Sequence, residues 1–406
     1  SLIVGRKNSL KTRREQSAKH YNAIKKFIDL INTQGDIIQA PSGRLITDEL
    51  VLTGVGDFEL TALNQIGTAL NPGVVAINVE GNVELLNEFS LNFDEIVNGT
   101  DSFLGSTLIA GAFSPGDLTL RTQNGDINQS NDSVFNVAGT TTFDTGTGNV
   151  KLLGFALNQN DFNGLSVDSG AIVEIADANG LLIDSTNVSD SMMVLAGGTI
   201  PSQIILDDNI SVANQLMLKA ELGVSQQRGF IIASTLLLDG ASDFDLGLAN
   251  EVSSISADIT GNLNLTNEVP LTIVKDSYTD LDGTMTSFAG IDLGSLLFDG
   301  NLTITTSNDD VVQNADAHVQ VAETASFDLG TGNLDLTFGD SNTDFINDND
   351  INVLAIASAG TAEFVDQNSI GLDNINLSGN MLIQSEGGSI SIQGQVDADG
   401  SMMLES

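Results

Sequence analysis

The chain has 406 residues and a formal net charge of −40, and it contains neither Cys nor Trp. The absence of Cys excludes a disulfide framework and a Cys-ligated zinc site. No run of residues is apolar enough for a membrane-spanning helix, and the hydrophobic fraction of 41% suffices for an aliphatic core that includes 18 Phe.

The charge is distributed unevenly along the chain. Residues 1–28 carry +7, from eight cations and one acid, whereas residues 29–406 carry −47, from six cations and 53 acids. The chain begins at Ser1 without Met, and we read it as a processed product or a segment of a longer protein.

The basic segment 1–34 contains the one long helix that the sequence predicts, over residues 9–33, with Ser9 as its cap and Gly35 after its end. Apolar residues at helical spacing form one stripe, and cations cover the other faces. We expect the helix to cap the first coil of the fold that follows, to dock on the acidic body of a neighbouring copy, or to do both. The residues assigned to self-association are Arg6, Lys7, Lys11, Arg13, Arg14, Lys19, Lys25, Lys26, Tyr21, Ile24, Phe27 and Ile28.

From Gly35 onward a short unit recurs, in which Gly and then Asn or Asp precede an aliphatic-x-aliphatic run. Its clearest examples lie in two related stretches, residues 143–162 and 327–345, which begin 184 positions apart (327 − 143 = 184). The unit begins at Gly56, Gly81, Gly116, Gly148, Gly261, Gly300, Gly332 and Gly379, with the variants GDIIQ at Gly35 and GDINQ at Gly125.

A turn pair that precedes a short alternating strand, repeated along the chain, indicates a solenoid. We predict that residues 35–406 form an all-β parallel β-helix of roughly 15–18 coils. The Gly-Asn and Gly-Asp pairs are expected at tight corners, because Gly readily adopts a positive φ and Asn and Asp tolerate it.

The stretches INQSNDSVFNVAGTTTFDTGTGNVKLLG and NDFNGLSVDSGAIVEIADANGLLIDS resemble the repeats of large exported bacterial adhesins of the filamentous-haemagglutinin type. The resemblance covers roughly residues 35–406. It implies a right-handed parallel β-helix, secretion, and a structural role at the cell surface. A basic N-terminal helix departs from the usual pattern of that family, which favours a filament subunit built on the same fold.

Few residues suggest catalysis. His20 lies in the basic segment, and His318 alternates with apolar residues and is expected to point outward from a strand. The carboxylate pairs Asp207-Asp208 and Asp309-Asp310 are read as solvated corner residues. We therefore predict that the protein is not an enzyme. The alternative is a carbohydrate-active β-helix enzyme that uses Asp309 and Asp310, or the cluster from Asp344 to Asp350, since glycosidases need two carboxyls across a sugar.

No cofactor is predicted, although calcium is possible, because hard cations bind several oxygens. The weak candidates are Asp344, Asp348 and Asp350, with Asp280 and Asp282 as a further group. Diffuse screening of the acidic body by divalent ions is the preferred alternative.

The sequence thus predicts a self-associating subunit of an extracellular bacterial filament, or an adhesin stalk. Its expected partners are copies of itself, head-to-tail or lateral, and cell-surface or matrix components. Nucleic acid is not expected, because the body would repel phosphate. A host-surface adhesin with a specific receptor, and contact of the basic helix with an anionic membrane, remain alternatives.

Overall fold

The computed structural model describes residues 3–5, 27–97, 108–114, 116–154, 160–197, 200–278, 292–293, 296–315, 317–337 and 349–406. Within these ranges all 40 regular elements are strands, and none is a helix. The chain divides into two compact units, residues 1–178 and residues 179–406, called unit 1 and unit 2 below.

The strands of unit 1 are β1 (Ile3–Gly5), β2 (Phe27–Asn32), β3 (Ile37–Ile38), β4 (Ile46–Thr47), β5 (Glu49–Val55), β6 (Phe58–Thr68), β7 (Asn71–Glu80), β8 (Val83–Asn87), β9 (Leu91–Phe93), β10 (Glu95–Val97), β11 (Leu108–Ser114), β12 (Leu118–Thr122), β13 (Ile127–Gln129), β14 (Val134–Asp144), β15 (Val150–Leu152), β16 (Asp161–Gly170) and β17 (Val173–Asp177).

The strands of unit 2 are β18 (Leu181–Val188), β19 (Met192–Ala196), β20 (Ile204–Leu206), β21 (Ile210–Ala220), β22 (Val224–Gln226), β23 (Ile231–Gly240), β24 (Phe244–Ile259), β25 (Leu263–Asn267), β26 (Leu271–Ile273), β27 (Asp276–Ser277), β28 (Asp292–Leu293), β29 (Leu296–Phe298), β30 (Leu302–Thr306), β31 (Val311–Gln313), β32 (Val319–Asp328), β33 (Leu334–Leu336), β34 (Asp350–Ala359), β35 (Ala362–Asp366), β36 (Ile370–Leu377), β37 (Met381–Ser385), β38 (Ile390–Ile392), β39 (Val396–Ala398) and β40 (Met402–Glu405).

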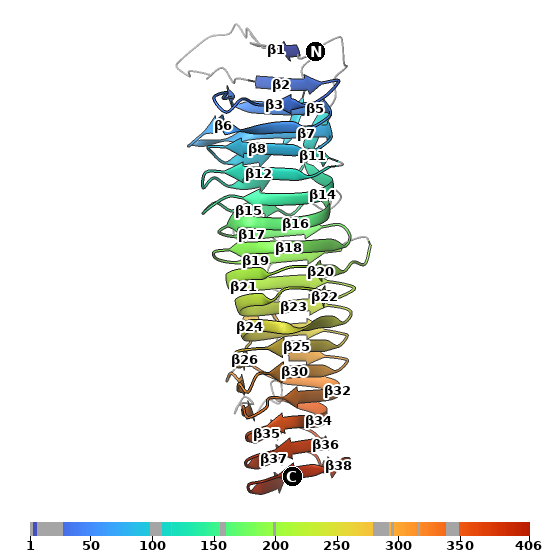
Figure 1. Cartoon of the computed structure of the whole chain (residues 1–406). Helices are drawn as coiled ribbons and strands as arrows, with labels where there is room; N and C mark the ends of the chain where they lie inside the picture. Colours follow the sequence, from blue (N-terminus) through green and yellow to red (C-terminus); the bar gives the residue numbers. More distant parts are fainter. Residues whose placement is uncertain are drawn as a thin grey trace, which may run out of the picture. The chain divides into compact units, whose positions relative to one another are not determined.

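In each unit a strand pairs in parallel with the equivalent strand of the next coil (Figure 1). In unit 1, β5 pairs with β7 from Glu49↔Val74 to Val55↔Glu80. In unit 2, β21 pairs with β23 from Ile210↔Ile231 to Lys219↔Asp239. The prediction of a parallel β-solenoid is therefore confirmed.

The coils are fewer than expected. The structure has about 14 turns, whereas the sequence predicted 15–18. The reason is unequal coil length: Asn262 bonds to its equivalent Asn301 across 39 residues, whereas Asp243 bonds to its equivalent Asn262 across 19. A single period taken from the shortest spacings therefore overestimates the number of coils.

The predicted helix over residues 9–33 is wrong at its C-terminal end. Phe27 and Ile28 begin β2, which pairs in parallel with β5 and antiparallel with β1. The run FIDLIN satisfies its backbone in this ladder, and the buried Leu30 and Asn32 alternate with partly exposed neighbours as in a strand. The remainder of the predicted helix lies outside the described residues.

The recurring Gly-Asn and Gly-Asp units stack on one another. The backbone N–H of Asn82 donates to Asp57 Oδ1 (2.8 Å), and the N–H of Asp117 donates to Asn82 Oδ1 (2.7 Å). In unit 2 the N–H of Asn262 donates to Asp243 Oδ1 (2.9 Å), and that of Asn301 to Asn262 Oδ1 (2.8 Å). A short side-chain acceptor at this position thus joins successive coils in both runs.

The glycine of the unit is required mainly for close approach of two backbones. A Cβ on Gly81 would lie 2.4 Å from the carbonyl oxygen of Gly56, one coil away. Among the recurring units only Gly35 and Gly56 have a positive φ, and the Asn residues with positive φ, such as Asn124, lie elsewhere. The expectation that positive φ explains these corners is therefore wrong for most of them.

The core is aliphatic, as predicted, with Phe at intervals. Leu, Ile and Val point inward at alternate positions, and nine Phe side chains of the described residues are buried. In unit 1, Phe93, Phe135 and Phe162 lie on successive coils, with ring centroids 4.8 and 5.7 Å apart. Such contacts add to the burial of each ring.

A buried polar network recurs at four places in the described residues. In one copy, Asn160 donates to Gln129 Oε1, to the Leu152 carbonyl and to the Ala176 carbonyl, and its own Oδ1 accepts the N–H of Phe135. One coil later, Asp177 Oδ2 accepts the N–H of Phe162. The four sets are Gln39–Asn64–Asn87 and Gln129–Asn160–Asp177 in unit 1, and Gln226–Asn250–Asn267 and Gln313–Asn349–Asp366 in unit 2.

The second and fourth networks belong to a module that occurs once in each unit. β12 recurs 184 positions later as β30 (302 − 118 = 184), and β13 recurs as β31. The corner residues Asn124 and Asn308 share a positive φ of 61° and 70°. The duplication inferred from the two stretches that begin at residues 143 and 327 is therefore confirmed in the folded chain.

The later part of that alignment needs correction. Phe162 donates its N–H to Asp177, and Ile351 donates its N–H to Asp366, so Phe162 corresponds to Ile351 and not to Phe345. The offset has risen to 189 (351 − 162 = 189), because unit 2 has five more residues between β33 and β34 than unit 1 has between β15 and β16.

Candidate functional site

Most residues assigned to self-association lie outside the described residues. These are Arg6, Lys7, Lys11, Arg13, Arg14, Lys19, Tyr21, Ile24, Lys25 and Lys26. The other two, Phe27 and Ile28, are partly buried in β2 and take part in its parallel ladder with β5. The role of the basic segment in self-association therefore stays a prediction.

The two carboxylate pairs lie at corners of unit 2. Asp310 Oδ1 accepts hydrogen bonds from the backbone N–H and the side-chain amide of Asn333, at 2.7 and 3.1 Å. Asp207 forms a bidentate ion pair with Arg228, which holds the pKa of the Asp207 carboxyl below its usual range. Both Asp310 and Asp207 thus act as links between coils.

His318 is buried, with 8% of its surface exposed, so the prediction that it points outward is wrong. It precedes β32, whose in-and-out alternation starts only at Val319, and burial lowers its pKa, with a smaller contribution from Lys275. His20 lies outside the described residues.

Of the calcium candidates, Asp344, Asp348, Asp280 and Asp282 lie outside the described residues. Asp350 is the first residue of β34 and is exposed. Within the described ranges no three His, Cys, Asp or Glu side chains gather in a way that could hold a metal ion. No helix in these ranges is long and apolar enough to cross a membrane.

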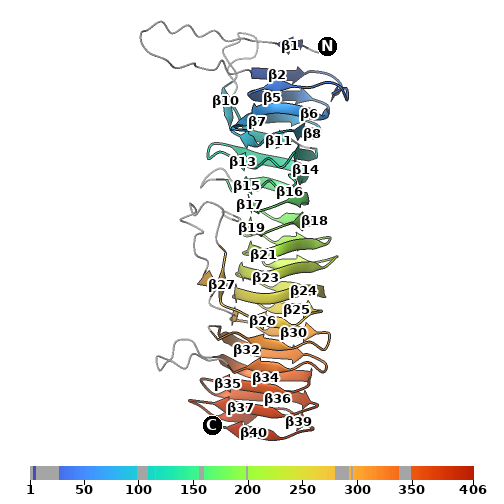
Figure 2. The ribbon, with the colours of Figure 1, turned by 90° about the vertical axis from the view of Figure 1, so that its left-hand side faces the viewer.

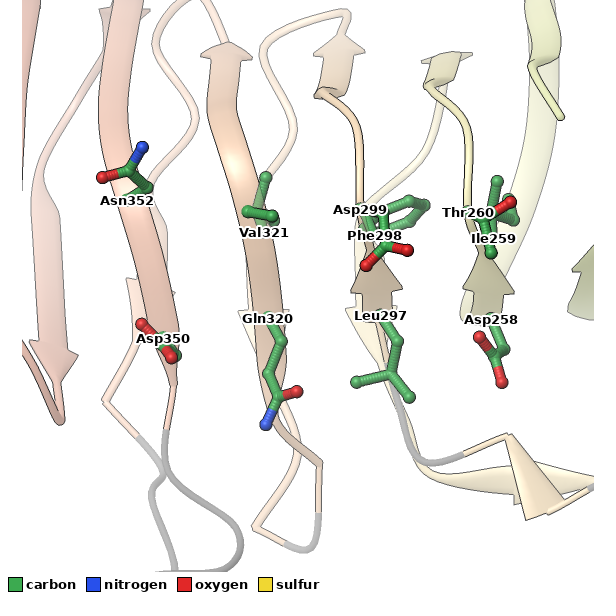
Figure 3. Close-up of a pocket in the computed structure, with 11 residues that line it drawn as sticks. Asp258, Ile259, Thr260, Leu297, Phe298, Asp299, Gln320, Val321, Asp350 and Asn352 are labelled. Atoms are coloured by element: carbon green, nitrogen blue, oxygen red, sulfur yellow. The ribbon is translucent and has the colours of Figure 1, made fainter. Parts of the chain in front are cut away.

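Asp350 does, however, line a groove on the outer side of unit 2, with a volume of about 470 Å³. Its walls come from four neighbouring strands, β24, β29, β32 and β34. Figure 3 shows Asp258, Leu297, Gln320 and Asp350 in one row, one from each strand. The parallel register explains this row, because Asp258 pairs with Leu297, Leu297 with Gln320, and Gln320 with Asp350.

A second row runs beside the first and contains Thr260, Asp299 and Asn352 (Figure 3). β27, which pairs antiparallel with β28, lies outside the main ladder of the same unit (Figure 2). The groove thus presents carboxylates, amides and one hydroxyl at regular intervals, with an apolar side chain between them.

The charges in the groove affect one another. Burial raises the pKa of Asp258, and Asp239 and Asp299 raise it further, while Lys219 opposes this shift. Lys219 itself is held by Asp239, with 2.5 Å between Nζ and Oδ2. The groove is therefore a place where added negative charge is unfavourable and hydrogen-bond donors are favoured.

The sequence identified only Asp350 among the groove residues. The row could not be recognised because its members are 39, 23 and 30 positions apart (297 − 258, 320 − 297, 350 − 320), spacings that depend on coil length. For two of the four buried networks the Gln residue did leave a signal in the sequence, since the variant units GDIIQ and GDINQ end in Gln39 and Gln129.

A family described as repeats of unknown function (DUF5649) matches residues 98–168 and 280–352, together less than half of the chain. These two matches fall on the duplicated module, one in each unit. No curated protein and no solved structure matches the chain.

Proposed function

We propose that the chain is a structural segment of an extracellular bacterial fibre or adhesin stalk, similar to the filamentous-haemagglutinin type, that associates with copies of itself. The observation that supports the proposal best is the ladder of Gly-Asn and Gly-Asp units. In several runs of coils, a coil supplies a side-chain acceptor to the next coil in the same way, as in Asp57, Asn82 and Asp117. A repeated link of this kind suits a protein whose task is to extend and bear load.

The charge distribution supports the self-association part of the proposal. Residues 1–28 carry +7 and the remaining chain −47, so the basic segment of one copy is attracted to the body of another. At physiological salt the Debye length is about 8 Å, so only close charge contacts persist.

The test is negative-stain electron microscopy of the purified chain at low and high salt. We expect fibres at low salt that shorten at high salt, and a variant with Lys11, Arg13, Arg14, Lys25 and Lys26 replaced by Gln should form shorter fibres at low salt. The matched control is Arg228→Gln, which removes an exposed cation outside the basic segment. Single particles under every condition would contradict self-association.

A carbohydrate-active enzyme is a second candidate. The specific observation in its favour is that Asp350 shares a groove with Asp258, whose pKa is raised. A general acid in a glycosidase needs such a shift. Release of reducing ends from polysaccharides by the wild-type chain but not by Asp258→Asn would support this candidate over a purely structural one.

A further inference from the structure

The row of residues in the unit 2 groove has a counterpart in unit 1. There Asn78 pairs with Phe113, Phe113 pairs with Asn136, and Asn136 pairs with Asp161. We call this row column 1, and the row Asp258–Leu297–Gln320–Asp350 column 2. In both columns the order along the coils is a polar residue, a large apolar residue, an amide and an Asp.

The last three members of the two columns occupy equivalent positions of the duplicated module. Phe113 and Leu297 are 184 positions apart, as are Asn136 and Gln320 (297 − 113 and 320 − 136). Asp161 and Asp350 are 189 apart, which is the offset found beyond the insertion. The last three members of each column lie inside the two matches to the repeat family.

Most members of the columns are exposed, and Leu297 and Asp161 are half-buried, whereas the inward residues beside them are buried. Phe113 is 38% exposed, whereas Ala112 is fully buried, and Asn136 is exposed between the buried Phe135 and Val137. Gln320 is likewise exposed next to the buried Val321. An exposed aromatic ring in a strand that otherwise alternates apolar-in and polar-out is not required by the fold.

We propose that columns 1 and 2 are two copies of a binding surface for an unbranched, neutral polysaccharide. The apolar side chain offers a platform for the face of a sugar ring. On neighbouring coils, about 4.8 Å away per step, the amide can donate hydrogen bonds to hydroxyl groups and accept them, and the carboxylate can accept them. A linear polymer of sugars fits this arrangement because its hydroxyls recur along one direction.

The charge of the chain selects among polymers. The body carries −47, and Asp299 and Asp239 lie near column 2, so sulfated or uronic polysaccharides would be repelled. Burial raises the pKa of Asp258, and Asp239 and Asp299 raise it further, which agrees with a site that disfavours further negative charge. A basic peptide would instead be attracted to the carboxylates, but it would make no use of the exposed ring at the centre of column 1.

The experiment is isothermal titration calorimetry of the whole chain, at a salt concentration that keeps it monodisperse, with cellohexaose, laminarihexaose and chitohexaose as probes. At least one hexasaccharide should bind at two sites per chain. Phe113→Ala should remove one of the two sites, and Leu297→Phe should tighten the other by about three- to tenfold, because an aromatic ring replaces an aliphatic platform.

The matched control is Phe230→Ala, which removes a ring of similar exposure (39%) from a corner of unit 2 outside both columns, and it should leave both sites intact. Absence of binding for all three hexasaccharides would overturn the proposal. So would binding that Phe113→Ala and Leu297→Phe leave unchanged, or binding of an oligolysine peptide alone. The readout does not depend on fibre formation, so failure here and failure of self-association can be told apart.

Discussion

At the scale of single residues, the most informative group is the carboxylate of Asp366. It is fully buried and occupies the place that Asn87 and Asn267 occupy in two of the other networks. Asn267 accepts the N–H of Val252 and donates to two carbonyls, whereas Asp366 accepts the N–H groups of Ile351 and Asn368. The fold therefore accommodates either an amide or a carboxylate at this corner.

Burial raises the pKa of Asp366 to about 6, and Asp350 adds to the shift, while the two backbone hydrogen bonds oppose it. The folded chain then keeps a proton that the unfolded chain releases near its ordinary pKa of 3.8. The contribution of Asp366 to the free energy of unfolding therefore falls as the pH rises from about 4 to about 6, by about 3 kcal/mol in total. Above that range this contribution stays constant.

We predict that Asp366→Asn removes this loss. The difference in unfolding free energy between variant and wild type should grow in favour of the variant as the pH rises from about 4 to about 6. Urea denaturation at a series of pH values measures it, with Asp399→Asn, an exposed corner carboxylate, as the control. A difference that does not change with pH would contradict this assignment.

At the scale of elements, the buried networks join three coils at a time. Asn349 donates to Gln313 and to the carbonyls of Leu336 and Val365, and accepts the N–H of Val319. Each buried polar group left without a partner costs about 1–3 kcal/mol. The network therefore specifies the register of successive coils as well as stabilising them.

Asn349→Ala is expected to lower the free energy of unfolding by more than about 3 kcal/mol, because several backbone groups lose their partner together. Urea denaturation provides the value. Asn376→Ala is the matched control, since Asn376 is exposed and its side chain makes one long hydrogen bond of 3.4 Å to Ala357. Equal losses for the two variants would show that burial of the network contributes nothing.

How far the sequence predicts the elements depends on the range of the interactions. The strand after Gly148 was predictable because its turn and alternation are local. The networks were not, because Gln129, Asn160 and Asp177 come together only after coil lengths are known, in a sequence where Asn is common. The helix prediction failed at Phe27 because its apolar spacing fits both a helix and a strand, and pairing with β5 decides between them.

At the scale of the whole molecule, the dominant physical property is the negative charge of residues 29–406. Repulsion between like charges disfavours the folded state and is weakened by salt. The prediction of diffuse screening rather than specific calcium binding follows from this charge.

We expect the melting temperature to rise with ionic strength and to be the same in calcium and magnesium chloride of equal concentration. Differential scanning calorimetry compares them, with sodium chloride of matched ionic strength as the reference. A distinctly higher value in calcium alone would indicate a specific site, and loss of that increment in Asp350→Asn would locate it.

We infer that the same coil module, with its buried Gln-Asn-Asp network, is built once in each unit. Hydrogen–deuterium exchange of the wild-type chain tests it most directly, read for peptides that contain Phe135 and Phe162 and for those that contain Val319 and Ile351. These N–H groups donate to the buried Asn and Asp side chains of the two networks, so both sets of peptides should be protected from exchange to a similar degree. Strong protection in one unit and rapid exchange in the other would contradict the claim.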